Sequence, residues 1–273
     1  MENRLQLYDV GKKVGKAPMY ALYLCLQKEI GRQCLLQIAN EVKGNVVVDR
    51  VAYILSEFAR YAGELEEKYA ENPKNAGKTL GYDLGFPELI DSFICQEQGG
   101  RRINVLAFRC VESVHDMIPI INITVKDRLR TDLRTSGWIM GKTLKMIDFA
   151  HSYGVTINST RGNNILIEKD NHYSLIFDWS LAQIYLEEIP EDVRCRDISH
   201  AAQAAIKMLG GDWEKGFLPD DGEKAFPVYS EYLFRLAHGK ESKAIRAHHG
   251  FYDIVDMFWK KEFYPFTTKP LNG

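Results

Sequence analysis

The chain has few cysteines and no long apolar run. Its five cysteines lie at positions 25, 34, 95, 110 and 195, and no two of them have the CxxC spacing of zinc and redox motifs. An odd, scattered set also argues against a disulfide framework, so we expect reduced cysteines in a cytoplasmic protein. No stretch approaches the ~20 apolar residues that a membrane-spanning helix needs. The sequence therefore predicts no membrane partner.

The chain also lacks an excess of charge of either sign. Its formal net charge is −2, from 35 basic and 37 acidic residues. Short basic clusters such as "KDRLRTDLR" are interleaved with aspartates, which is typical of a solvated face. Without a basic surface to attract phosphates, we expect no nucleic-acid partner.

Strand patterns dominate the first half of the sequence. Segments rich in aliphatic and aromatic residues predict five strands, at 5–10, 19–27, 33–39, 87–96 and 101–111. Between the third and the fourth, the period changes to that of an amphipathic helix over 45–70, which the breakers of "ENPKNAGK" end. We expect an antiparallel five-stranded sheet with one helix.

The second half is mainly helical. Four segments predict helices, at 137–152, 196–211, 228–238 and 242–260. Gly154 stops the first of them, and a hairpin with the turn "DNH" is expected between strands in 164–169 and 173–179. The predicted fold class is α+β with two lobes, a sheet lobe over 1–112 and a helical lobe over 113–273.

The stretch "GVTINSTRGNNILI" resembles the catalytic loop of protein kinases, whose pattern is H-R-D-L-x-x-x-N. Ser159 stands at the aspartate of that pattern, and Asn164 follows it five residues later. "IFDW" places Asp178 where the metal-binding aspartate of the family belongs, and Asp197 resembles its structural aspartate at the start of an alanine-rich helix. The resemblance implies the bilobal protein-kinase-like fold over roughly residues 8–260.

The N-terminal motifs of the family are degenerate here. "VGKAPMYALYLCL" matches the glycine-rich loop, but only Gly15 is retained, while Ala17 and Tyr20 stand at the second and third glycines. Tyr20 either packs as a strand aromatic or fills the space of the phosphates. "CLLQI" matches the third strand, where Gln37 replaces the lysine that holds the nucleotide phosphates. A neutral amide cannot supply that charge.

Compensating groups are few. The helix glutamate that normally pairs with the lysine corresponds to Glu57 or Glu64, and either is a surface carboxylate if it has no lysine to pair with. Lys16 is the nearest substitute cation. Arg161 falls where many kinases place a lysine near the transferred phosphate, and it either binds an anion or is a surface residue. Gly15, Ala17, Tyr20, Gln37 and Arg161 form the expected nucleotide-binding set.

No catalytic residue of the family is intact. Ser159 has a hydroxyl with no activating partner and is a very poor base near neutral pH. Ile157 replaces the histidine that braces the loop. Asn164 and Asp178 survive as oxygen ligands suited to Mg²⁺, or alternatively as residues that hydrogen-bond the loop and the strand end.

The resemblance therefore implies a pseudokinase, either a degenerate bacterial-type serine/threonine kinase or a variant similar to aminoglycoside phosphotransferases, whose Asp-Trp runs resemble "DWSLA". Its expected role is to bind or regulate an unidentified protein partner, with weak or absent binding of ATP and Mg²⁺. The alternative is an atypical ATP-dependent phosphotransferase or nucleotidyl-transfer enzyme that uses Asn164 and Asp178 for the metal.

Overall fold

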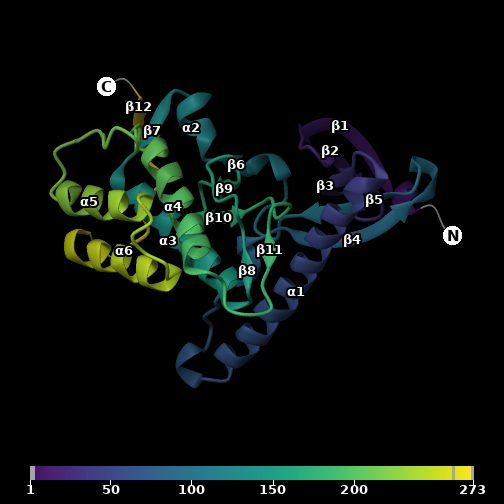
Figure 1. The fold of residues 1–273 in the computed structure, drawn as a ribbon, viewed down its shortest axis with the longest axis horizontal. Coiled ribbons are helices and arrows are strands. Elements are labelled where there is room, and N and C mark those ends of the chain that lie inside the picture. The colour runs from purple at the N-terminus through teal and green to yellow at the C-terminus, as the bar shows by residue number, and fades with distance from the viewer. Residues whose placement is uncertain (1–3, 260–261, 272–273) are drawn as a thin grey trace. The chain divides into compact units, whose positions relative to one another are not determined.

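The computed structural model describes residues 4–259 and 262–271. The chain divides into two compact units, Met1–Met117 and Ile118–Gly273. The boundary expected between 112 and 113 lies a few residues before this division. The fold class is α+β, with an antiparallel sheet in the first unit and helices in the second (Figure 1).

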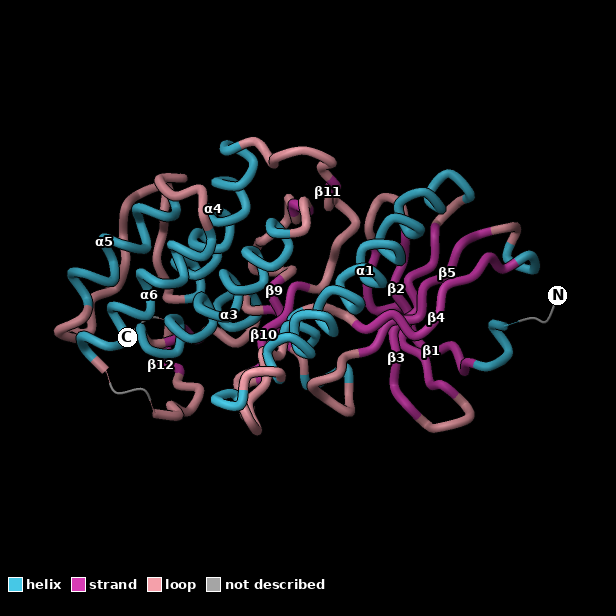
Figure 2. The backbone as a smooth tube through the Cα atoms, turned by 90° about the horizontal axis from the view of Figure 1, so that it is seen from below, coloured by secondary structure: helices cyan, strands magenta, loops and turns pink. Residues whose placement is uncertain are grey.

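The first unit is built on a sheet with the strand order β1-β2-β3-β5-β4, in which all neighbours are antiparallel. One helix, α1 (Asn45–Ala70), follows the third strand and packs on the sheet (Figure 2). The predicted five antiparallel strands and their single helix are confirmed. The strands are β1 (Tyr8–Lys16), β2 (Tyr20–Gln27), β3 (Arg32–Ala39), β4 (Glu88–Cys95) and β5 (Arg101–Ala107).

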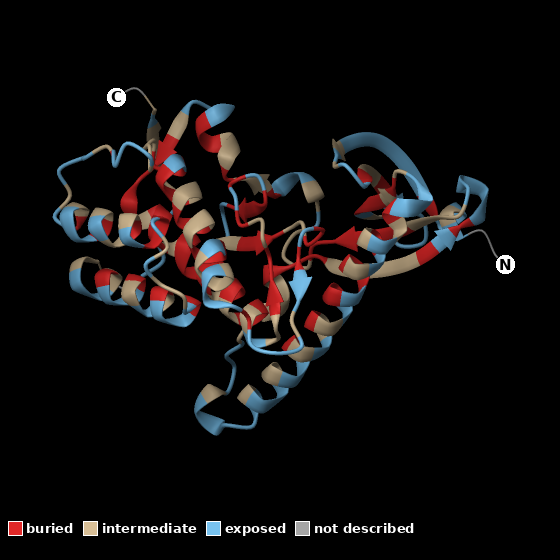
Figure 3. Cartoon of the chain, viewed as in Figure 1, coloured by how far each residue is buried: buried red, intermediate tan, exposed pale blue. Residues whose placement is uncertain are grey.

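Both faces of the central strand β3 are covered, which explains its continuous apolar run. Cys34 and Leu36 belong to an apolar cluster on one face, where Cys34 lies opposite Cys25 of β2. On the other face, Ala39 packs with Val48 of α1. The centre of the sheet is accordingly buried, whereas the outer strand β1 is exposed (Figure 3).

The N-terminal part of the sheet differs from the prediction for 5–10. Residues Arg4–Leu7 form a 3₁₀ helix, and β1 begins only at Tyr8. It then continues to Lys16, into the segment that was matched to the glycine-rich loop. The reason is that this segment pairs with β2. The pairing includes two register shifts and extends to Lys16, which lies opposite Ala21.

The second unit is mainly helical, as predicted. α3 contacts α4 and α6, and α4 contacts α5. The helix expected from 137 begins earlier because the Asp132 side chain caps it, accepting a 2.7 Å hydrogen bond from the Thr135 N–H. Residue 260, the end of the helix expected over 242–260, lies outside the described residues. The helices are α2 (Ile121–Val125), α3 (Leu133–Ser152), α4 (Glu191–Met208), α5 (Phe226–Ala237) and α6 (Ala244–Phe258).

Short strands connect the helices of this unit. The predicted hairpin is present as β9 (Ile165–Glu168) and β10 (Tyr173–Ile176). β6 pairs with β9, β8 with β11 and β7 with β12. These five strands were not predicted, because two or three residues carry no measurable alternation: β6 (Ile118–Pro119), β7 (Leu129–Thr131), β8 (Val155–Thr156), β11 (Gln183–Ile184) and β12 (Thr268–Pro270).

Further 3₁₀ turns join the strands and helices of the first unit: Val42–Gly44, Pro73–Asn75, Tyr82–Gly85, Gln96–Gln98 and Val114–Asp116. Among the helices that the structure describes, none combines the length and the apolar character needed to cross a membrane.

Gly154 ends α3, as its sequence position predicts. Its φ is +70°, and a Cβ there would lie 2.5 Å from the Tyr185 carbonyl oxygen. Its own carbonyl accepts a 2.7 Å hydrogen bond from the Tyr185 N–H. The residue thus joins the helix end to the segment that follows β11, and only glycine fits this close approach.

Gly154→Ala should lower the free energy of unfolding by about 2 kcal/mol or more, since it combines left-handed strain with a backbone clash. Gly216→Ala is the matched control, because its φ is +62° but its Cβ would meet nothing within 4 Å. Urea unfolding of both variants measures the difference. Equal losses in the two variants would show that the contact with Tyr185 does not constrain residue 154.

Candidate functional site

Asp197 organises the segment that follows α3. Its side chain is fully buried near the start of α4 and accepts 2.8 Å hydrogen bonds from the backbone N–H groups of Ile157 and Asn158. The His151 ring nitrogen Nε2 lies 3.0 Å from the same carboxylate. The Asp197 backbone carbonyl accepts a hydrogen bond from the Thr160 hydroxyl. The carboxylate of Asp197 thus fixes residues 157–158, and its backbone carbonyl holds Thr160.

Asn164 ties this segment to the strand end at Asp178. Its amide nitrogen donates to the carbonyl oxygens of Ser159 at 2.7 Å and of Asp178 at 2.9 Å. Its amide oxygen accepts from the Asp178 N–H. The side chain is only 2% exposed. Of the two roles expected for Asn164, the structure contains the hydrogen-bonding one.

The Asp178 carboxylate is held by its own turn. Oδ1 accepts from the Ser180 N–H at 2.9 Å, and Oδ2 accepts from the Ser180 hydroxyl at 3.1 Å. Trp179 between them is fully buried and donates its indole N–H to the Ile176 carbonyl. Because a carboxylate oxygen has more than one lone pair, Asp178 can still accept a cation.

These two residues fit a magnesium ion only in part. They offer one carboxylate and one amide oxygen that is already engaged. Within residues 4–259 and 262–271, no group of three or more His, Cys, Asp or Glu side chains could hold a metal ion. Since Mg²⁺ demands six oxygen ligands, most of them would have to come from water or a bound phosphate.

Gln37 lies in a buried neutral network. It is 2% exposed, and its amide oxygen accepts a 3.0 Å hydrogen bond from the Asn104 side chain. Asn104 also donates to the Val48 carbonyl of α1 at 2.7 Å and accepts from the Ser92 hydroxyl at 2.8 Å. Gln37 and Asn104 therefore form a pair of neutral amides between the sheet and α1.

The turn between β1 and β2 is stabilised by hydrogen bonds within its own backbone and by those of one side chain. The Ala17 N–H donates to the Tyr20 carbonyl at 2.8 Å. The Asn40 side chain donates to the carbonyls of Ala17 and Pro18, both at 3.0 Å, while its backbone N–H donates to Met19. A loop that cradles phosphates must present N–H groups to them. This turn instead uses the Ala17 N–H internally.

Tyr20 packs as a strand aromatic. Its side chain is 4% exposed and forms an apolar cluster with Ala39 and Val48. Gly15 lies opposite Leu22 of β2, and a Cβ at Gly15 would come 3.1 Å from the Leu22 side chain. Both residues therefore have structural roles within the sheet and α1.

The remaining charged candidates lie at the surface. Arg161 is exposed, and its positive charge adds to burial in lowering the pKa of His200. Glu57 and Glu64 both pair with Arg60 on α1, at 2.7 and 2.6 Å. Both glutamates thus have their ion-pair partner on their own helix.

The predicted residues fall into two groups. The second unit brings together Ser159, Asn164 and Asp178 through direct hydrogen bonds, and Arg161 is two residues from Ser159. Gly15, Ala17, Tyr20 and Gln37 belong to the first unit.

Three functional positions were missed at the level of sequence. Asn40 and Asn104 hold the turn and the amide pair, and His151 contacts Asp197. Asn104 had a usable signal, since it is a polar residue within the otherwise apolar run "INVLAF". His151 lies within the helix predicted over 137–152, but nothing in the sequence indicated its partner. Asn40 had no such signal, because it follows its strand as an ordinary turn residue.

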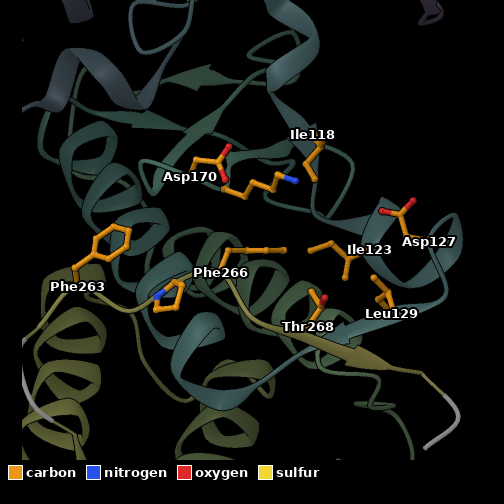
Figure 4. A pocket seen from close by; sticks show the side chains of 10 residues that line it. Ile118, Ile123, Asp127, Leu129, Asp170, Phe263, Phe266 and Thr268 are labelled. Atoms are coloured by element: carbon orange, nitrogen blue, oxygen red, sulfur yellow. The ribbon is translucent and has the colours of Figure 1, made fainter.

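None of these residues lines the 560 Å³ cavity that the second unit also contains. Its wall includes Ile123, Leu129 and Phe266, with the carboxylates of Asp127 and Asp170 set apart from each other (Figure 4). One lysine, Lys169, also lines it. The described lining thus has two carboxylates and one ammonium. This balance of charge does not attract the phosphates of a nucleotide.

No model of a known protein family matches the chain, and no curated protein matches it.

Proposed function

We propose that the protein is a pseudokinase, with a degenerate protein-kinase-like fold that has lost phosphoryl transfer and serves to bind a protein partner. The observation that carries the proposal is the buried amide pair of Gln37 and Asn104, since the resemblance to kinases assigns the phosphate-binding lysine to position 37. Phosphoryl transfer depends on positioning and on cancelling the negative charge of the phosphates. A buried pair of neutral amides contributes neither.

The second unit supports the kinase-like part of this proposal. The Asp197 carboxylate accepts two backbone N–H groups from the segment that corresponds to the catalytic loop. Asn164 bridges that segment and Asp178, which correspond to the catalytic-loop and metal-binding motifs.

The loss of the reaction is supported at two further positions. Ser159 offers no carboxylate to accept a proton, and its carbonyl is already bound by Asn164. The turn at residues 17–20 is held by Asn40, with its Ala17 N–H used within the turn. Each defect alone weakens catalysis, and together they affect both the phosphates and the nucleophile.

A role in protein binding is supported by the segment that follows Asp178. Leu181, Ile184 and Leu186 expose 58%, 42% and 100% of their surface. The backbone there is fixed by pairing of β11 with β8 and by the hydrogen bond from the Asn158 side chain to the Leu181 carbonyl. Apolar side chains displayed on a fixed backbone suit a protein contact.

We expect Mg·ATP either not to bind or to bind with a dissociation constant weaker than the low micromolar range, and we expect no transfer of label from ATP to protein substrates. Gln37→Lys, Ser159→Asp and the double variant should stay at background transfer, because roles that act as a unit are not restored singly. Calorimetry and label transfer measure both quantities. Gln33→Lys, an exposed change on the same strand, controls for the added charge.

The enzyme alternative predicts a different pattern. It requires transfer by the wild type that disappears in Asp178→Ala, since Asp178 would be the main metal ligand. Asp170→Ala, which removes an exposed carboxylate nearby in sequence, should leave such transfer unchanged. Transfer that depends on Asp178 but not on Asp170 would overturn the pseudokinase proposal.

A further inference from the structure

A second cavity of 480 Å³ lies within the second unit, between helices α3 and α6. α3 lines it with Gly137, Trp138 and Gly141, and α6 lines it with Phe251 and Tyr252. Residues 262–264 and His172 of the β9–β10 turn complete the wall. Small-molecule sites have volumes of about 300–1,000 Å³ and walls of this mainly aromatic kind.

The two glycines are not explained by packing within the protein. They lie one turn apart on the cavity side of α3, although glycine is unfavourable inside a helix relative to alanine. A Cβ at Gly137 would meet Tyr229 at 3.8 Å, and one at Gly141 would meet His248 at 3.9 Å. Both distances are ordinary van der Waals contacts, so alanine would fit. What glycine provides at these positions is open space on the floor of the cavity.

The charges around the cavity are mainly positive. Among the described residues that line it, Arg134, Lys142 and Lys145 are basic, and Glu262 is acidic. The Arg134 guanidinium lies 4.4 Å from the ring centre of Tyr264, and Lys142 donates to the His172 carbonyl. Burial, with a smaller contribution from Lys142, lowers the pKa of His172. The lining therefore favours an anion.

The aromatic wall is already ordered. The ring of His172 is stacked on the rings of Trp138 and Phe263, with distances between ring centres of 4.3 and 4.4 Å. The indole N–H of Trp138 is buried, and no residue that the structure describes accepts its hydrogen bond. A buried donor without an acceptor costs free energy.

From these observations we infer that the cavity binds an organic anion, whose apolar body lies on the glycine floor against the aromatic wall and whose acidic group lies near Arg134, Lys142 and Lys145. The inference uses only residues of the second unit and does not depend on the pseudokinase proposal. The acidic group is a carboxylate or a sulfonate, and the body is either an aromatic ring system or an alkyl chain.

Calorimetric titration with 8-anilino-1-naphthalenesulfonate and with dodecanoate tests the inference and separates the two kinds of body. We expect one site for at least one probe. Gly141→Leu should weaken that binding at least tenfold by filling the floor. Gly63→Leu is the matched control, because Gly63 lies inside α1, is exposed and has nothing within 4 Å of its Cβ position. It should bind as the wild type does.

Two further variants keep the test decisive. If Gly141→Leu fails to fold, Gly141→Ala still narrows the cavity and should weaken binding severalfold. Lys142→Gln combined with Lys145→Gln should also weaken it severalfold, through the loss of charge. The inference is overturned if neither probe binds the wild type. It is also overturned if Gly141→Leu binds the probe as tightly as the wild type does.

Discussion

Asp197→Ala should lower the free energy of unfolding by about 2–6 kcal/mol, because it leaves two buried backbone N–H groups without an acceptor at about 1–3 kcal/mol each. The donors are those of Ile157 and Asn158, and His151 loses its partner as well. A loss of this size is a large part of the stability of an ordinary domain. Urea unfolding, followed by circular dichroism, measures it.

The matched control is Asp192→Ala on the same helix. Asp192 is 75% exposed and lies 3.7 Å from Arg196, so its removal should cost less than about 1 kcal/mol. Asp197→Asn should fall between the two, since an amide keeps one acceptor but turns a donor toward the backbone. If Asp197→Ala were no more costly than Asp192→Ala, the segment 157–160 would not depend on this carboxylate.

Asp221→Ala should lower the stability of the second unit by about 3 kcal/mol, because it leaves the buried guanidinium of Arg130 without its ion-pair partner. Arg130 is 6% exposed and donates from both terminal nitrogens to the two oxygens of Asp221. Lys269 donates to the same carboxylate from an exposed position, at 2.9 Å. Lys269→Ala is therefore the control, with an expected loss below about 1 kcal/mol.

The same pair predicts a dependence on pH. The Arg130 guanidinium, with a smaller contribution from Lys269, holds the pKa of Asp221 well below its usual range. A depressed pKa means that the stabilisation is complete above the unfolded-state pKa of about 3.9 and is lost as the pH falls below it. The advantage of the wild type over Asp221→Asn should thus be constant near neutral pH and shrink in acid. An advantage that grew in acid would contradict this assignment.

Much of the first unit could be predicted because its signals are local and repeated. The strands are marked by runs of apolar residues, and the helix over 45–70 is marked by a helical period that extends over several turns. The structure contains these strands and this helix in the predicted order. The path of residues 8–16 could not be predicted in the same way. That path is fixed by pairing with β2, including two register shifts that no single residue signals.

Within the candidate site, the role of a residue could be predicted where its side chain had only one evident role. Asp197 was expected to have a structural role, and it has one. Tyr20 and Asn164 each had two open roles, and choosing between them needed the burial of Tyr20 and the hydrogen bonds of Asn164. The cavity between α3 and α6 was not predicted. Gly137 and Gly141 indicate a cavity only when the residues that face them from other helices are known, and the sequence does not give these.

The outer strand β1 bears on how the first unit behaves at high concentration. It is an edge of the sheet, and nearly all of its residues are exposed, including Lys12, Lys13 and Lys16. Lysines and register shifts on an edge both discourage a further strand from adding to it. This edge of the sheet should therefore resist the addition of a further strand. A partner that bound at this edge would have to recognise side chains rather than extend the sheet.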